Sequence, residues 1–145
     1  MRIALAADHG GYQLKEELKK HLASTGMQFL DFGTDTEASC DYPDYGKLAA
    51  KAVVDGDAEF GVVICKSGIG MSIVANKVKG VRCGTCHSEQ DAALARQHNH
   101  ANVLSLAANK LSPELAAEIL EAFVRTEPEG GRHKRRVDKI AQLER

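Results

Sequence analysis

Apolar runs and helical patterns alternate along the whole chain. Five short apolar segments predict β-strands, over residues 2–7, 27–33, 60–65, 81–86 and 102–107. After the first of them, Leu14, Leu18 and Leu22 recur at helical spacing, and Gly26 marks where that helix stops. The strands lack alternating polar residues, which is typical of a parallel sheet buried on both faces.

Residues that favour helix caps mark where later helices begin. Ser88 and Ser112 each stand before a helical pattern, and Asp91 is placed to complete a capping box with Ser88. A short helix is predicted over residues 70–78, and the last helix runs from about Arg132 to the C-terminus. The helix that starts near Pro43 has an apolar stripe of four residues: Leu48, Ala49, Ala52 and Val53.

This alternation predicts βαβ crossovers and one α/β domain, with a five-stranded parallel sheet between two layers of helices. No linker divides the 145 residues. Ligands of such sheets bind beyond the carboxyl ends of the strands. Functional side chains are therefore expected among residues 8–9, 65–70 and 86–87.

Charge and composition exclude several classes of partner. The net charge of −1 argues against nucleic acid, which requires an excess of lysine and arginine on one face. No apolar stretch approaches the roughly 18 residues of a membrane span, and the N-terminal run is too short for a signal peptide. The four cysteines then indicate reduced thiols. We expect a soluble cytoplasmic protein with no membrane or nucleic-acid partner.

The segment CKSGIG (residues 65–70) joins the third strand to the helix that follows it. Its backbone N–H groups can form an anion-binding concavity at a helix N-terminus, although a plain strand-to-helix turn fits the glycines equally well. It matches no known phosphate loop, and Met71 stands where a cysteine phosphatase needs an arginine. A helix N-terminus and Lys66 favour a thiolate, so Cys65 is a candidate base or nucleophile.

Three other motifs have weaker functional interpretations. CGTCH (residues 83–87) matches redox and haem-attachment patterns, but residues three apart on a strand point to opposite faces, so Cys83 and Cys86 are interpreted as structural. The His98-x-His100 pair supplies too few metal ligands, although His98 could reach the strand-end crevice as an acid or base. Arg132 and Arg136 lie one helical turn apart and could grip a phosphate.

Five ordered motifs, ADHGGYQLK, DYPDYG, CKSGIGMSIVANK, RQHNHANVL and EGGRHKRRV, resemble those of the type B ribose-5-phosphate isomerases. That family also contains galactose-6-phosphate and allose-6-phosphate isomerases. The resemblance implies a Rossmann-like α/β/α sandwich and aldose–ketose isomerisation without a metal or other cofactor. It also implies a homodimer with active sites between subunits, leaving a dimer of dimers open. The helix over residues 132–145 is expected at the dimer interface.

The resemblance also implies residue roles. Cys65 would move a proton between C2 and C1, and the amides of the 66–70 loop would stabilise the enediolate. Ser67 would hydrogen-bond a sugar oxygen and assist proton exchange. His98 would open the furanose ring, while Asp8 holds the ring oxygen or hydroxyl groups. The substrate-binding residues would be His9, Tyr42, Lys66, Gly68, Ile69, Gly70, Asn99, Arg132 and Arg136.

Three residues depart from the family pattern. Lys66 replaces a residue that is usually glycine, Asn109 replaces an arginine that often faces the phosphate, and His100 replaces an aspartate. We hypothesise that Lys66 or Lys110 restores the missing positive charge. The expected reaction interconverts ribose 5-phosphate and ribulose 5-phosphate, as in the pentose phosphate pathway. The alternatives are an isomerase of a hexose 6-phosphate (allose or galactose) and a non-catalytic sugar-phosphate-binding protein.

Overall fold

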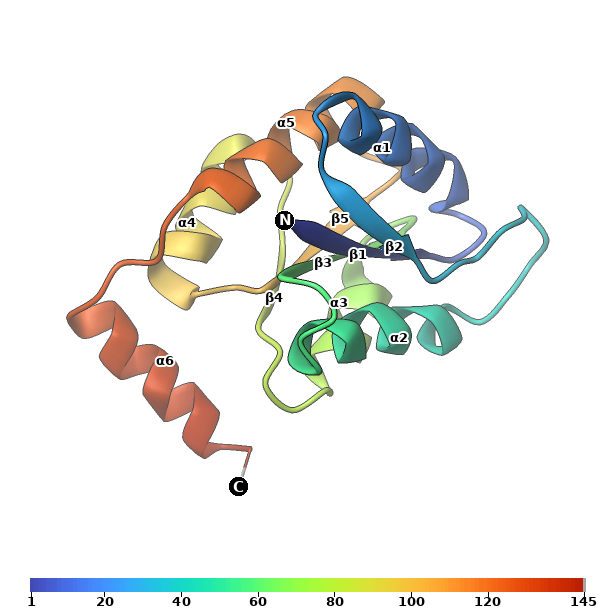
Figure 1. The fold of residues 1–145 in the computed structure, drawn as a ribbon. Helices are drawn as coiled ribbons and strands as arrows, with labels where there is room; N and C mark the ends of the chain where they lie inside the picture. The colour runs from blue at the N-terminus through green and yellow to red at the C-terminus, as the bar shows by residue number, and fades with distance from the viewer. Residues whose placement is uncertain (145) are drawn as a thin grey trace.

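The computed structural model describes residues 1–144, and its elements follow the predicted alternation (Figure 1). The strands are β1 (Arg2–Ala7), β2 (Gln28–Asp31), β3 (Phe60–Cys65), β4 (Cys83–Thr85) and β5 (Val103–Ala107). The helices are α1 (Tyr12–Ser24), α2 (Tyr42–Val54), α3 (Ile69–Asn76), α4 (Glu89–Asn99), α5 (Pro113–Arg125) and α6 (Arg132–Gln142). The last helix therefore ends at Gln142; position 145 of its predicted range lies outside the described residues.

The five strands form one parallel sheet in the order β2-β1-β3-β5-β4, which confirms the predicted fold class. The three central strands are almost fully buried, as their continuous apolar runs predict, whereas the edge strands β2 and β4 are partly exposed. The predicted strand over residues 81–86 is shortened to β4. One reason is that the Arg82 N–H donates to the Asn102 side chain (2.8 Å) instead of joining the ladder.

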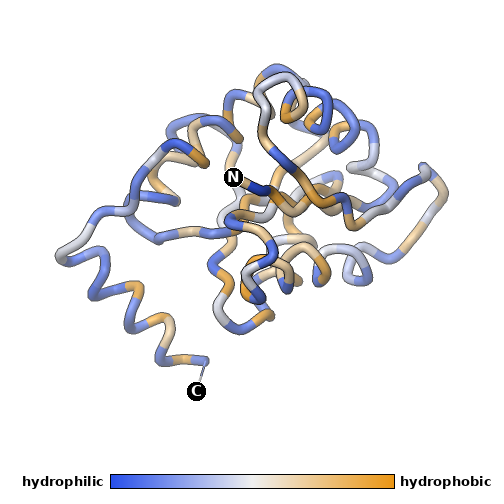
Figure 2. Tube along the Cα trace, in the orientation of Figure 1, coloured by the Kyte–Doolittle hydropathy of each residue, from blue (hydrophilic) through white to orange (hydrophobic). Residues whose placement is uncertain are grey.

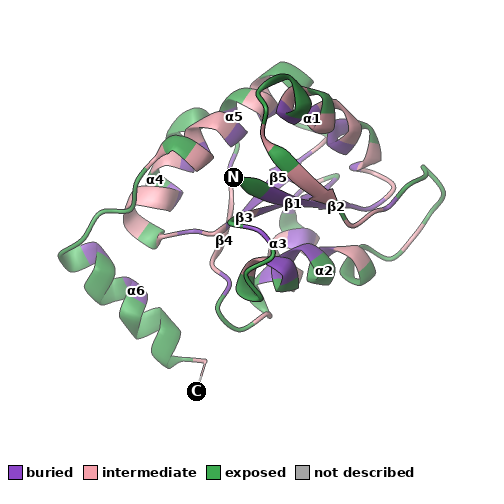
Figure 3. Cartoon of the chain, in the orientation of Figure 1, coloured by how far each residue is buried: buried purple, intermediate pink, exposed green. Residues whose placement is uncertain are grey.

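Helices α1, α4 and α5 cover one face of the sheet and α2 and α3 cover the other (Figures 1 and 3). The predicted stripe of α2 is partly wrong, because Leu48 is exposed while Gly46, Ala49, Ala50 and Ala52 are buried. Small residues let α2 approach its neighbours closely. A Cβ atom on Gly46 would lie only 2.6 Å from the Met71 sulfur.

The serine caps form as predicted. Ser88 Oγ accepts the Asp91 N–H (3.0 Å), and Ser112 Oγ accepts the Leu115 N–H (3.1 Å). The Asp91 carboxylate accepts from the N–H of His87 (3.0 Å), one residue before the cap, so the capping box is shifted by one position. Among the described residues, no helix is long and apolar enough to cross a membrane.

Helix α6 packs against α4 and extends away from the body of the molecule (Figures 1 and 2). His133 and Val137 are the buried residues of this helix. Ile140 and Leu143 are 42% and 84% exposed, so much of the apolar edge at the C-terminal end remains uncovered in one chain.

A buried lysine ties α1 to the edge strand β2. The Lys15 side chain is 1% exposed, and its Nζ donates to both oxygens of Asp31 at 2.8 and 2.7 Å. Lys19 donates to Asp31 (2.8 Å) and to Glu16 (3.0 Å). Burial alone would raise the pKa of Asp31, but hydrogen bonds from Lys15, Lys19 and the Gly33 N–H bring it below 3.8.

We expect Asp31→Ala to lower the free energy of unfolding by about 2 kcal/mol at neutral pH. Breaking a buried pair costs about 3–5 kcal/mol because a charge is left unpaired, but solvent reaches Asp31 and reduces this figure. Denaturant unfolding at one fixed protein concentration measures the difference. The control is Asp138→Ala, which breaks the exposed pair with Lys134 and should cost less than about 1 kcal/mol.

The ion pair between Asp31 and Lys15 makes the effect of Asp31→Ala depend on pH. Because the folded-state pKa of Asp31 is lowered, its stabilisation is fully present above pH 3.8, the ordinary value. It is lost as the pH falls through the folded-state pKa, so the unfolding free energies of wild type and Asp31→Ala should converge in acid. A difference that stayed constant down to the acid transition would contradict this assignment.

Candidate active site

The candidate site lies where the connections of the sheet change direction. From β1 the chain passes to β2 on one side and then returns to β3 on the other, so β1 and β3 flank the switch point. Ala7 pairs with Ile64, which places Asp8 beside Cys65 at the carboxyl ends of the two strands. Parallel α/β sheets bind their ligands at this position.

A cleft of 500 Å³ opens at this edge. It is lined by Asp8, His9, Tyr42, Cys65, Lys66, Ser67, Ile69, Gly70 and Ile73. The structure thus brings together eight of the residues predicted for the site. Ile73 was not predicted, although it lies one helical turn after Ile69 on α3. Both isoleucines are exposed, at 56% and 61%.

The β1–α1 turn holds Asp8 in a defined orientation. Its Oδ1 accepts the N–H groups of Gly10 (3.0 Å) and Gly11 (3.1 Å), and the residue is 7% exposed. Within residues 1–144, this leaves Oδ2 available for a substrate hydroxyl. Gly11 permits the turn to pass close to β3, because a Cβ atom there would lie 2.6 Å from the Ile64 carbonyl oxygen.

The loop before α2 orients His9. The N–H of Cys40 donates to His9 Nδ1 at 3.3 Å. A ring nitrogen that accepts a hydrogen bond carries no proton, so the neutral ring has its proton on Nε2. His9 is therefore prepared to donate from Nε2 to an anion. Nothing in the sequence marked Cys40, because the contact is with a backbone group 31 positions away.

Cys65 ends β3 with only 6% of its surface exposed, and α3 begins four residues later. Gly68 adopts φ = 76°, which glycine tolerates, and lets the chain turn directly into the helix. Ser67 Oγ accepts the N–H of Ile69 (3.2 Å). First-turn N–H groups of a helix lack intrahelical partners, so the start of α3 presents donors and a positive dipole end at the cleft.

Lys66 is the cation that the loop itself supplies. It is exposed and, among residues 1–144, forms no ion pair. Its side chain lies across Gly10, where a Cβ atom would come within 2.5 Å of Lys66 Cγ. Its carbonyl accepts the Asn109 N–H (3.0 Å). Lys66 lines the cleft and Lys110 does not, which favours Lys66 as the compensating charge.

The cysteines of the CGTCH motif face different parts of the core. Cys86 belongs to the cluster beneath α1, α4 and α5, whereas Cys83 packs against the cluster beneath α2 and α3. Both thiols are free, and burial raises the pKa of each to about 12. These protonated thiols on opposite faces agree with the structural interpretation.

The remaining predicted residues lie elsewhere. His98 and Asn99 form the end of α4, and Arg132 and Arg136 lie on α6; none lines the cleft. Asn99 instead lines a separate groove of 440 Å³ beside Ile140 and Leu143. Within one chain, His98 does not reach the strand-end cleft, because it lies in the last turn of α4. Crossover helices run antiparallel to the strands, so α4 ends at the amino edge of the sheet, opposite Cys65.

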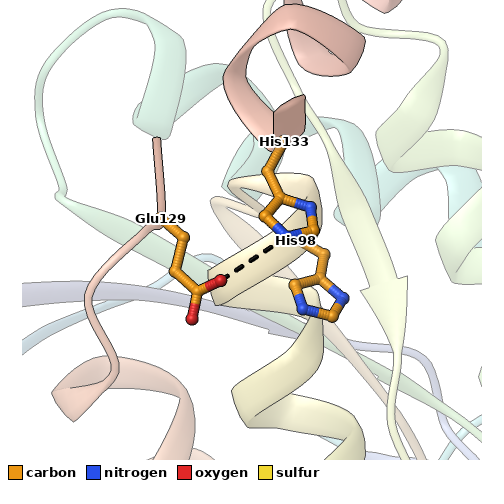
Figure 4. A group of neighbouring side chains, drawn as sticks. All are labelled: His98, Glu129 and His133. Carbon is orange, nitrogen blue, oxygen red and sulfur yellow. Dashed lines mark ion pairs between the residues drawn. The ribbon is translucent and has the colours of Figure 1, made fainter. Parts of the chain in front are cut away.

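His98 forms part of a small cluster with Glu129 and His133, whose possible ligand atoms lie within 4.8 Å of one another (Figure 4). The two imidazoles are stacked, with ring centroids 4.1 Å apart and planes inclined by 6°. Nitrogen lone pairs lie in the ring planes, and the planes of stacked parallel rings do not meet near one ion. The arrangement therefore does not fit a tetrahedral metal site.

Comparison with known proteins agrees with this architecture. The family profile described as Ribose/Galactose Isomerase matches residues 3–140. The chain belongs to this family. Ribose-5-phosphate isomerase B of Escherichia coli is 41% identical over 143 residues, covering 99% of this chain and 96% of that protein.

Two solved structures of family members superpose closely on the chain. The ribose-5-phosphate isomerase B of Clostridium thermocellum has a TM-score of 0.97 at 43% identity, covering 99% of this chain and 97% of that one. The enzyme of Mycoplasma genitalium, solved with bound ribulose 5-phosphate, has a TM-score of 0.93 at 41% identity, covering 99% and 95%. Membership of the ribose/galactose isomerase family makes the protein a sugar isomerase.

Proposed function

We propose that the protein interconverts ribose 5-phosphate and ribulose 5-phosphate at a site assembled from two copies of the chain. The observation that supports this proposal is that the residues predicted for one site form two separate groups, which we call half-sites. The cleft with Cys65 lies at the carboxyl edge of the sheet, while His98 and the two arginines lie on α4 and α6. The ribulose 5-phosphate bound to the Mycoplasma genitalium relative supports the choice of sugar.

Cys65 is the proposed base for the proton transfer. As a thiolate, it removes the proton from C2 of the open aldose, and the C2–H electron pair forms the C1–C2 double bond of an enediolate. The charge on the former carbonyl oxygen lies beside the N–H groups that begin α3. Return of the proton to C1 then gives the ketose and regenerates the thiolate. Ser67 exchanges the hydroxyl proton between O1 and O2.

Met71 removes the alternative of a carboxylate base within this loop. Some family members use a carboxylate within the loop, and this chain has Met71 at that position. The Met71 side chain lies on the buried face of α3 and has no ionisable group. Within the loop, Cys65 is the residue that ends the strand, lines the cleft and has an ionisable thiol.

His98 of the second copy is the proposed catalyst of ring opening. In ribose 5-phosphate the C4 hydroxyl closes a furanose ring on C1, and opening it requires a proton to move from the C1 hydroxyl to the ring oxygen. Through its available Oδ2, Asp8 accepts from the sugar hydroxyl groups, including the ring oxygen once ring opening has protonated it. Ribulose 5-phosphate has no such ring, because O5 is phosphorylated and O4 would close only a four-membered ring.

The phosphate is a dianion and needs several cationic or N–H donors. His9 offers the Nε2 proton that the Cys40 contact leaves free, and Lys66 lies in the same cleft. Arg132 and Arg136 of the second copy complete the binding site as forked donors on one helical face. Tyr42 and Asn99 are the proposed sugar contacts; the Tyr42 ring lies against Gly70, where a Cβ atom would be 2.8 Å from its Cζ.

Exposed apolar side chains support the assembly of two copies. Ile69 and Ile73 border the cleft on α3, and Ile140 and Leu143 border the groove that contains Asn99. Covering these surfaces with a second copy removes apolar area from water and joins the half-sites at once. The free cysteines agree with a reducing cytoplasmic location.

A panel of sugar phosphates tests the proposed reaction. We expect ribose 5-phosphate to be converted faster than allose 6-phosphate or galactose 6-phosphate, as followed by ketose formation. Lys66→Ala should raise the KM for ribose 5-phosphate by about tenfold with kcat nearly unchanged, because it removes a contact made before and during the reaction. Lys110→Ala, which removes the same charge outside the cleft, is the matched control.

Each other outcome of the panel has a defined meaning. Preferred turnover of a hexose 6-phosphate would replace ribose 5-phosphate by that sugar. Binding without turnover of any sugar would favour the non-catalytic sugar-phosphate-binding protein. An ordinary KM that Lys66→Ala does not change would contradict the compensating role of Lys66.

A further inference from the structure

We propose that His133, held in place by Glu129 and His100, positions the imidazole of His98 for ring opening. This inference rests on the proposed function, in which His98 is the ring-opening residue. His133 is a positioning residue here, since its proposed contact is with His98 and not with the sugar. We call His100, Glu129 and His133 the His98 support.

The stack of His98 on His133 is the first observation. The two rings lie 4.1 Å apart and nearly parallel, and they come from different helices, α4 and α6 (Figure 4). His133 is 7% exposed, although the neighbouring residues of α6 on both sides are exposed. His98 is the last but one residue of its helix, where helix ends fray. A buried flat ring against its face restricts the rotation of His98.

Glu129 connects the stack to the end of α4. Its N–H donates to the Gln97 carbonyl (3.0 Å), and its own carbonyl oxygen lies 2.6 Å from His100 Nε2. Its carboxylate is 3.5 Å from His133 Nε2 (Figure 4). The segment before α6 is thus attached on both sides of His98, so the position of His133 is tied to the helix that carries His98.

His100 adopts an unusual backbone conformation to make this contact. It has φ = 48°, in the left-handed region that non-glycine residues seldom occupy. Its carbonyl accepts from Arg82 Nε (2.9 Å), which caps the end of α4. Because the Glu129 carbonyl can only accept, His100 must carry a proton on Nε2. The family usually has an aspartate here, and an anion could not donate this bond.

The charges around His133 favour its neutral form. Burial, followed by His98 on α4 and by Arg132 and Arg136 on α6, lowers the pKa of His133, while Glu129 opposes the shift. Two stacked imidazolium rings would repel each other. A neutral His133 therefore supports the ring of His98 while leaving His98 free to take up and release the proton that ring opening requires.

His133→Ala tests the His98 support by separating ring opening from proton transfer. We expect kcat/KM for ribose 5-phosphate, which must be opened, to fall by about tenfold, since small misplacements of catalytic groups are costly. The fixed equilibrium constant requires the same loss in the net reverse reaction. Exchange of the C1 hydrogen of ribulose 5-phosphate with D₂O, followed by NMR, passes only through the enediolate and needs no ring chemistry, so it should change by less than about twofold. Lys134→Ala, at the neighbouring exposed position of α6, should leave both measurements unchanged.

His133→Phe is the second variant, and it guards against a general loss of structure. It keeps a flat ring against His98 and should recover at least half of the lost activity toward ribose 5-phosphate. Equal losses of ribose 5-phosphate conversion and of C1 hydrogen exchange, or a His133→Ala variant that matches Lys134→Ala, would overturn the positioning role. A wild-type protein that does not isomerise ribose 5-phosphate would instead overturn the proposed function, so the two failures are distinguishable.

Discussion

Cys65→Ala is expected to lower kcat/KM for ribose 5-phosphate by about a thousandfold, the largest effect of any single substitution. A positioned general base contributes a factor of about 10² to 10⁴, and the proposal assigns the neighbouring His9 to the phosphate and Asp8 to the sugar hydroxyls. Asp8 uses Oδ1 to hold its own turn, and Met71 is apolar and buried. Ketose formation from ribose 5-phosphate measures the loss, and the loss should be equal in the reverse direction.

Cys86→Ser is the matched control for this prediction. It also removes a thiol just after the end of a strand, but that thiol lies outside both the cleft and the groove that contains Asn99, and burial raises its pKa to about 12. Its activity should stay within about twofold of wild type. Cys65→Ala should still bind ribulose 5-phosphate in a calorimeter, since the phosphate and sugar contacts remain. Retention of more than about a tenth of the activity would show that another group is the base.

Mixing two inactive variants is expected to restore activity. Cys65→Ala and His98→Asn each disable the conversion of ribose 5-phosphate when present in every chain. In a mixed dimer, one site combines both substitutions, while the other combines an intact Cys65 with an intact His98 from the second copy. Random exchange at equal concentrations makes half of the dimers mixed, so about a quarter of the sites regain activity.

The physical reason for this recovery is the placement of the two half-sites at opposite edges of one sheet. A control mixture without subunit exchange should remain inactive. Exchange itself can be verified by copurification of an untagged variant with a tagged one. No recovery after verified exchange would mean that Cys65 and His98 act within the same chain, and the two-copy site would be rejected.

Several features of the site follow from local signals in the sequence. Asp8 follows the last residue of β1 and Cys65 ends β3, and the rule for parallel sheets places both at one edge. The glycines of the 65–70 loop correctly indicated a turn into a helix, and Gly68 has the positive φ that the turn requires. The serine caps also formed, because a cap depends on contacts within three or four residues.

Other features depended on contacts between distant segments. The periodicity of α2 marked Leu48 as buried, but close packing of Gly46 against Met71 turned Leu48 outward. The sequence contained His98 and His133 without any sign that their rings stack, because the contact joins residues 35 positions apart on two helices. The orientation of His9 by the Cys40 backbone was equally invisible.

By itself, the sequence determined the order of strands and helices, the cleft residues next to strand ends and the resemblance to a sugar isomerase family. These depend on hydrophobic periodicity, on local turn chemistry and on one topological rule. Only the tertiary structure decided that His98, Asn99, Arg132 and Arg136 lie away from Cys65. The reason is that a crossover helix returns the chain to the opposite edge of the sheet. Residues predicted for one site are therefore divided between the two edges of the sheet.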